Sequence, residues 1–205
     1  MVALSTDAVH KFLAACEGSS FRDALFVALH TGMRRSELLA LKWEYVDLER
    51  GRLQVVAGLH RIKGEGLLLL PVKTKHSRRS VSISSEVVDV LRQIQRTQLM
   101  HQSAFSSGWN GDGFVFADEL GNPIDPARLS REFGKVRRAA GIEGVRLHDL
   151  RHTHATLMLQ ANVHPKVVSE RLGHASVQIT MDIDSHIIPG LQEDAADRFA
   201  KLLEK

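Results

Sequence analysis

The chain has 205 residues, 43% of them hydrophobic and 25% charged, a mix typical of a globular domain that buries its own core. Its single cysteine excludes an internal disulfide, and its longest apolar run, residues 66–72, is too short to span a bilayer. With no basic-then-apolar segment at the N-terminus, we expect a cytoplasmic protein. The net charge of +3 and pI of about 9.2 are mildly basic and by themselves weak evidence for a nucleic-acid partner.

Three helices are predicted near the N-terminus. Ser5 precedes a periodic stretch over 9–16 and is expected to cap it. A second helix is predicted over 21–29, ending near Gly32, and a third over 36–43 with leucines on one side.

The middle of the chain changes character. The segments 52–56, 67–72 and 79–83 are short and rich in Val, Leu or Ile, and turn residues separate them. They predict a small antiparallel sheet of three strands.

Helices resume in the second half of the chain. They are predicted over 85–100, 126–140, 147–160, 165–172, 178–182 and 191–203. The last of these places apolar side chains on one face. We therefore expect one domain over 1–205, mainly α with a small antiparallel three-stranded sheet (α+β).

Two arginines, Arg34 and Arg35, stand where the second predicted helix ends and the third begins. An arginine at such a junction presents a rigid fork of donors to a phosphate, and the backbone N–H groups of the new helix add to an anion site. A solvated arginine pair capped by Glu37 is the alternative, and the patch alone does not decide between them.

Basic residues also cluster on the hairpin turn between two predicted strands. They are Lys73, Lys75, His76, Arg78 and Arg79. A second basic group comprises Arg128, Arg131, Lys135, Arg137 and Arg138. Both groups could neutralise DNA phosphates, but charge alone favours solvated faces that keep the surface soluble.

Two further patches carry histidines. His148, Arg151 and His152 fall three and four residues apart and share one helix face, which suits the binding of an oxyanion. The spacing of His148 and His152 also fits zinc ligation, but no third ligand follows at a clear spacing. His174 is expected on a sharp turn between Gly173, a helix stop, and Ser176, a helix cap.

Taken in order, the four patches resemble the tyrosine recombinase (phage integrase) family, C-terminal catalytic domain. The segments are TGMRRSELLALKW, KTKHSRRSVSI, LHDLRHTHAT and RLGHAS. The resemblance spans nearly the whole chain and implies the fold of DNA breaking–rejoining enzymes. The catalytic positions it implies are Arg34, Lys73, His148, Arg151 and His174, with Glu37 as a supporting acid and with Arg35, Lys75, Arg78 and Arg79 as DNA-binding residues.

The resemblance implies strand cleavage and rejoining through a 3′-phosphotyrosyl intermediate, with duplex DNA as partner and no metal or other cofactor. Arg34 and Arg151 would clamp the non-bridging oxygens, with a hydrogen bond from His174. Lys73 would protonate the leaving 5′ oxygen, and His148 would handle the proton of the nucleophile.

One position departs from the family. Asp184 stands where the nucleophilic tyrosine should be, and the only tyrosine, Tyr45, is interpreted as a packing residue. A carboxylate at 184 is several ångströms shorter in reach, and a misplacement of about 1 Å can cost about a hundredfold in rate. We therefore hypothesise that this chain binds DNA without cleaving it, whether the substitution is natural or was introduced on purpose.

Two expectations concern assembly. The family's N-terminal DNA-binding domains are expected to be absent, so that DNA binding is weak and salt-sensitive. The segment 191–203 is expected to support self-association on DNA, with packing on its own domain as an equal alternative. The competing functions are a decayed, purely DNA-binding or regulatory relative and, remotely, a metallohydrolase using His148 and His152.

Overall fold

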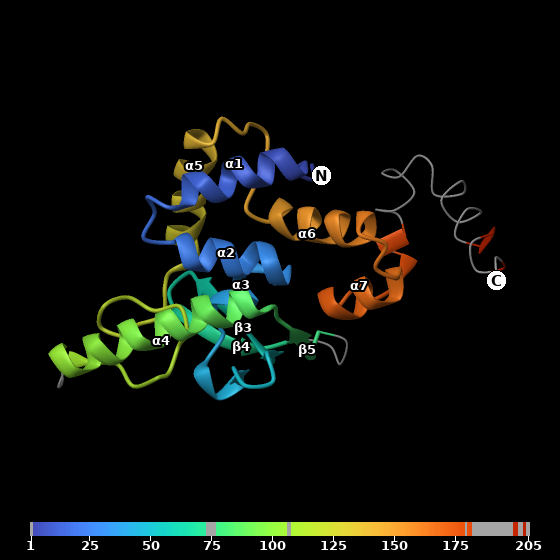
Figure 1. Cartoon of the computed structure of the whole chain (residues 1–205). Helices are drawn as coiled ribbons and strands as arrows, with labels where there is room; N and C mark the ends of the chain where they lie inside the picture. Colours follow the sequence, from blue (N-terminus) through green and yellow to red (C-terminus); the bar gives the residue numbers. More distant parts are fainter. Residues whose placement is uncertain are drawn as a thin grey trace.

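The structure is a computed structural model that describes residues 2–72, 77–105, 108–178, 180–181, 199–200 and 203. The predicted fold class is confirmed, because the chain is mainly helical with small antiparallel sheets (Figure 1). The helices are α1 (Thr6–Cys16), α2 (Arg22–Thr31), α3 (Arg35–Leu39), the 3₁₀ turn η1 (Trp43–Tyr45), α4 (Ser85–Phe105), α5 (Pro126–Ala139), α6 (Asp149–Gln160) and α7 (Pro165–Leu172). The strands are β1 (Val46–Asp47), β2 (Arg52–Val55), β3 (Ala57–Ile62), β4 (Gly66–Pro71) and β5 (Arg79–Ser82).

The N-terminal helices follow their local signals, except at one end. The Ser5 side chain accepts a hydrogen bond from the Ala8 N–H at 3.3 Å, as a helix cap does. α2 ends at Gly32, which takes the left-handed conformation with φ 64°. α3 stops at Leu39 instead of continuing to 43, because the Leu41 carbonyl and the Trp43 N–H pair with the 113–115 segment. Pairing with a distant segment thus overrides the helical pattern there.

The predicted three-stranded sheet is wrong in its membership. Within the described residues, β1, β2 and β5 form one antiparallel sheet, whereas β4 pairs with β3 in a separate hairpin. The prediction missed β3 because the second residue of this strand is Gly58, and glycine is typical of turns. Gly58 instead lies in the strand and against α3, where an added Cβ would come within 3.3 Å of the Ser36 side chain. Glycine there lets the strand approach the helix closely.

Two apolar clusters hold the domain together. The large one joins α1, α2, α3, α5 and the three-stranded sheet around fully buried side chains such as Leu25 and Leu38. A smaller one, formed by Ala155, Leu159, Val168 and Leu172, packs α7 onto α6. Because α6 also packs against α2, the turn after α7 is held close to the α2–α3 junction (Figure 1).

None of the helices in the described ranges, including the 21-residue α4, has the apolar length that a membrane crossing requires. The amphipathic helix predicted over 191–203 lies outside the described residues except at Phe199, Ala200 and Leu203, so the prediction is not tested.

Candidate nucleic-acid interface

Arg34 lies at the junction predicted for it, as the residue that precedes α3. Its backbone N–H donates to Glu37 Oε2 at 2.9 Å, and its guanidinium Nη1 donates to Glu37 Oε1 at 2.7 Å. Glu37 therefore fixes both ends of this residue. The Arg34 side chain is still 38% exposed, so it can reach a ligand from a defined position.

Glu37 is buried between two arginines. Its side chain is 4% exposed and takes an ion pair from Arg34 and two hydrogen bonds from Arg79, at 3.1 and 2.8 Å. Burial alone would raise the pKa of Glu37, but the hydrogen bonds and positive charges of Arg79 and Arg34 outweigh it and lower the pKa. The carboxylate is therefore ionised and acts as the anchor of this cluster.

Arg79 does not fit its predicted place as a DNA contact. Its side chain is 5% exposed, and its donors are committed to Glu37, to the Arg171 carbonyl and to the Ser77 carbonyl. The reason is the register of β5, which points Arg79 to the same face as the buried Val81. The neighbouring Arg78 is exposed, as a DNA contact requires.

Arg151 is buried without a carboxylate in contact. It is 4% exposed, and its guanidinium donates to the Gly32 carbonyl at 2.8 Å and to the Leu172 carbonyl at 2.5 Å. Burial is the main cause that lowers the pKa of Arg151; the charges of Arg34 and Arg79 lower it further, and the charge of Glu37 raises it. The resulting pKa of about 9 leaves Arg151 charged at pH 7. No carboxylate of the described residues forms an ion pair with it. Such a buried cation favours an anion beside it.

Two histidines accompany Arg151 on the first turns of α6. His148 immediately precedes the helix, and its ring meets that of His152 edge to face at 5.2 Å between centroids. Burial, then the nearby Arg151 charge, lowers the pKa of His148, which is therefore a neutral base at pH 7. Among the described residues no group of three His, Cys, Asp or Glu side chains is placed to hold a metal ion around this pair.

His174 follows the end of α7, as predicted. Gly173 takes the left-handed conformation with φ 66°, and Ser176 accepts from the Gln178 N–H at 3.1 Å. The His174 Nδ1 lies 2.8 Å from the hydroxyl of the buried Thr180. Burial, then the charges of Arg151 and Arg34, lowers the pKa of His174 to about 4, so the ring is neutral at pH 7. It lies close enough to Arg151 and Arg34 for their charges to act on its ring.

The structure thus brings together Arg34, Glu37, His148, Arg151 and His174. Three of the predicted site residues, Lys73, Lys75 and Asp184, lie outside the described residues, and their predicted roles stay predictions.

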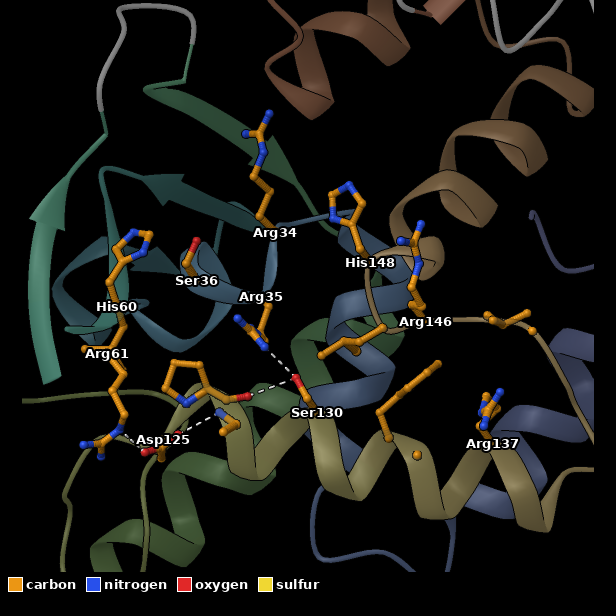
Figure 2. Close-up of a pocket in the computed structure, with 18 residues that line it drawn as sticks. Arg34, Arg35, Ser36, His60, Arg61, Asp125, Ser130, Arg137, Arg146 and His148 are labelled. Atoms are coloured by element: carbon orange, nitrogen blue, oxygen red, sulfur yellow. Dashed lines mark hydrogen bonds and ion pairs between the residues drawn. The ribbon is translucent and has the colours of Figure 1, made fainter. Parts of the chain in front are cut away.

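A basic groove of about 950 Å³ leads away from Arg34 and His148 between β3 and α5 (Figure 2). Arg35 donates to the Ser130 hydroxyl of α5 at 2.6 Å, and Arg61 of β3 pairs with Asp125, which caps α5. The other charged or titratable side chains that line it include His60, Arg137 and Arg146. The groove is therefore lined by cations from four separate segments.

Sequence reasoning missed several of these groove residues. His60 and Arg61 were overlooked together with β3 itself, and Arg146 was passed over although it directly precedes the Leu147-His148 motif. Of the basic cluster predicted over 128–138, only Arg137 lines the groove, while Arg128 lies over the Phe21 ring and Lys135 pairs with Glu132. A helix distributes such a cluster around its circumference, so the run does not form a single patch.

Comparison with known proteins places this geometry in a family. The sequence model of the Phage integrase family matches residues 3–184. A XerC-like tyrosine recombinase of Caldanaerobacter subterraneus subsp. tengcongensis is 32% identical, over 94% of this chain and 52% of the relative. The integrase of Staphylococcus phage L54a is 30% identical, over 88% of this chain and 51% of the relative. The chain spans about half the length of these relatives.

Solved structures agree at the level of the fold. The integrase of transposon Tn1549, in complex with a circular intermediate DNA, matches with a TM-score of 0.80 and 22% identity, over 98% of this chain and 66% of that one. The motifs, the cluster that they form and the family match converge, and the chain belongs to the phage integrase family of tyrosine recombinases.

Proposed function

We propose that this chain is the catalytic domain of a site-specific DNA recombinase, and that Arg34, Arg151 and His174 hold the phosphate of duplex DNA at which the strand is exchanged. The observation that carries the proposal is the buried, charged Arg151 with backbone carbonyls as its partners. With Arg34 and Arg79 nearby and Glu37 as their carboxylate partner, the described cluster has an excess of positive charge. A phosphodiester supplies the missing negative charge.

The chemistry follows from these positions. Strand cleavage accumulates negative charge on the non-bridging oxygens, and preorganised donors stabilise that charge in a site that excludes water. Arg34 and Arg151 act as the charged donors, and the neutral His174 donates a hydrogen bond. In a chain with tyrosine at position 184, His148, also neutral at pH 7, accepts the proton of the tyrosine hydroxyl, while Lys73 protonates the leaving 5′ oxygen. This sequence of steps requires neither a metal nor another cofactor.

In its present sequence the chain binds DNA but does not cleave it. The family forms its covalent intermediate on a tyrosine, and position 184 carries an aspartate. An aspartate cannot provide the aromatic hydroxyl that the tyrosine reaction uses, and its shorter side chain misplaces the attacking oxygen. A carboxylate close to Arg34 and Arg151 would instead compete with the DNA phosphate.

The groove extends the contact along the duplex. Arg61, Arg137 and Arg146 line it, and Arg35, Lys75 and Arg78 add positive charge that suits the phosphate backbone. The Tn1549 integrase, which shares the fold, was solved in complex with DNA. Copies of the chain associate on DNA through the segment 191–203, and they bind it in the bacterial cytoplasm, at the nucleoid.

A covalent-trapping assay tests the function. The preferred site is first enriched from a random duplex pool and then presented as a nicked duplex that traps the phosphotyrosyl product. Asp184→Tyr is expected to become attached to the DNA, whereas the parent chain and the matched control Asp184→Phe, which lacks the hydroxyl, are not. Attachment of the parent chain would contradict the loss of cleavage.

A different outcome would favour the competing function. If all three forms bind the enriched duplex and none becomes attached, the chain is a purely DNA-binding relative. Both of these outcomes require binding to the DNA phosphates, which makes affinity fall steeply as the salt concentration rises. Affinity that does not change with salt would mean that the chain has no function on DNA.

A further inference from the structure

Two arginines connect β5 and α7 in both directions. The Arg79 Nε donates to the Arg171 carbonyl at 2.7 Å, and the Arg171 Nη1 donates to the Ser82 carbonyl at 2.6 Å. Each guanidinium therefore hydrogen-bonds the backbone of the other element. We call these two side chains the arginine latch.

On the β5 side, Arg79 is connected to Arg34 through Glu37. The two Nη atoms of Arg79 bind both oxygens of Glu37, at 3.1 and 2.8 Å, and Glu37 in turn binds the backbone N–H and the guanidinium of Arg34. The planar fork of Arg79 thus sets the orientation of the carboxylate that orients Arg34.

On the α7 side the latch holds the turn that carries His174. Arg171 also donates to the His30 carbonyl and to His154 Nε2, both at 3.0 Å. Burial and the Arg171 charge lower the pKa of His154 to about 3, so this ring is neutral and accepts the bond. The residue after Arg171 is Leu172, whose carbonyl binds Arg151, and His174 follows two residues later.

We propose that Arg79 is a positioning residue for strand exchange, which orients Arg34 through Glu37 and fixes the turn bearing His174 through the Arg171 carbonyl. The inference rests on the proposed function, in which Arg34 and His174 hold the DNA phosphate. Stability alone does not explain a buried ion pair, because apolar residues of similar volume often serve the fold as well. Placement of donors does explain it, since a shift of about 1 Å at a reacting centre costs about a hundredfold in rate.

The test is a double-mutant cycle on the chain as it exists. Arg79→Lys keeps the charge beside Glu37 but removes the fork and the Nε donor. Binding to a random-sequence duplex is measured over a range of salt, well below the melting temperature. The salt slope is the steepness with which the logarithm of the DNA-binding constant falls with the logarithm of the salt concentration. Arg79→Lys is expected to lower this steepness by about 1, as loss of one phosphate contact does. Arg34→Ala is expected to do the same, and the double variant is expected to lose no more than Arg34→Ala alone.

A second measurement follows the α7 side. Titration of the His174 ring by NMR is expected to show its low pKa rising toward the ordinary value in Arg79→Lys, because a loosened turn is better hydrated. The matched control is Arg92→Lys on α4, whose side chain is 49% exposed, and it is expected to change neither the slope nor the His174 pKa.

The outcomes separate the latch from the proposed function. Arg79 does not position Arg34 and His174 if Arg79→Lys leaves both the salt slope and the His174 pKa unchanged. The same conclusion follows if Arg79→Lys lowers the salt slope as much in the Arg34→Ala variant as in the parent chain. If Arg79→Lys does not fold, Glu37→Gln enters the same cycle, because it breaks the same connection to Arg34 while preserving side-chain shape. If the parent chain binds no duplex, the proposed function fails. The His174 titration still tests whether Arg79 fixes the turn that carries His174.

Discussion

Two neighbouring basic regions hold their charges in different ways: the buried cluster of Arg34, Glu37, Arg79 and Arg151, and the groove beside it. In the cluster, Glu37 and Arg79 are 4% and 5% exposed, and Arg151 is bonded to backbone carbonyls. In the groove, Arg61 is 54% exposed and Arg146 is 71% exposed, and each pairs with an aspartate. Buried charges are held rigidly and are costly to leave unpaired, whereas exposed charges are mobile and screened by salt. The cluster therefore suits precise chemistry, and the groove suits attraction of a polyanion.

The largest effect is expected from breaking the cluster at its carboxylate. Glu37→Ala leaves Arg79 buried without its partner, and removal of one member of a buried ion pair costs about 3–5 kcal/mol of unfolding free energy. Urea unfolding measures the loss. The matched control, Asp89→Ala, removes a 72%-exposed partner of Arg92 and should change stability by less than about 1 kcal/mol. Equal losses in the two variants would mean that burial does not distinguish these ion pairs.

A further effect on stability is expected from pH. The pKa values of His154 and His174 are lowered to about 3 and about 4, whereas an unfolded histidine titrates at about 6.5. Between these values the unfolded chain binds more protons than the folded chain, so the free energy of unfolding falls as the pH is lowered below about 6.5. The decline should level off near the folded pKa values, apart from the titration of carboxylates.

Chemical unfolding at a series of pH values checks this dependence. His154→Gln keeps a polar side chain beside Arg171 but does not titrate, and it should make the decline between pH 6.5 and 4 shallower. An unchanged slope in this variant would show that His154 does not contribute to the pH dependence.

The smallest effect on stability is expected in the groove. Arg61→Gln removes an exposed ion pair with Asp125, and stability should change by less than about 1 kcal/mol. Its effect should appear in DNA binding, where the salt slope falls by about 1 and affinity weakens similarly for all sequences. Duplex binding at several salt concentrations provides the measurement. If Arg61→Gln caused a large loss of stability and left the salt slope of DNA binding unchanged, the groove would hold its charges as the buried cluster does.

Much of the site was predictable because its signals are local. A glycine at 32 or 173 ends a helix through its left-handed conformation, and the residue that follows such a turn is presented in a defined direction. These turns place Arg34 and His174. The alternation of β5 puts Arg79 on the same face as Val81 and Ile83, but alternation alone does not specify what this face packs against.

What the sequence determined by itself was the family, the fold class and most of the helices in the described ranges. What only the tertiary structure decided was how neighbouring residues divide their roles. Arg78 and Arg79 are chemically alike and adjacent, yet one is exposed and the other is buried against Glu37. Likewise, Gly58 lies in a strand because β3 pairs with β4, and this strand packs closely on α3. These outcomes depend on contacts between segments far apart in the chain, whose pairing no local pattern specifies.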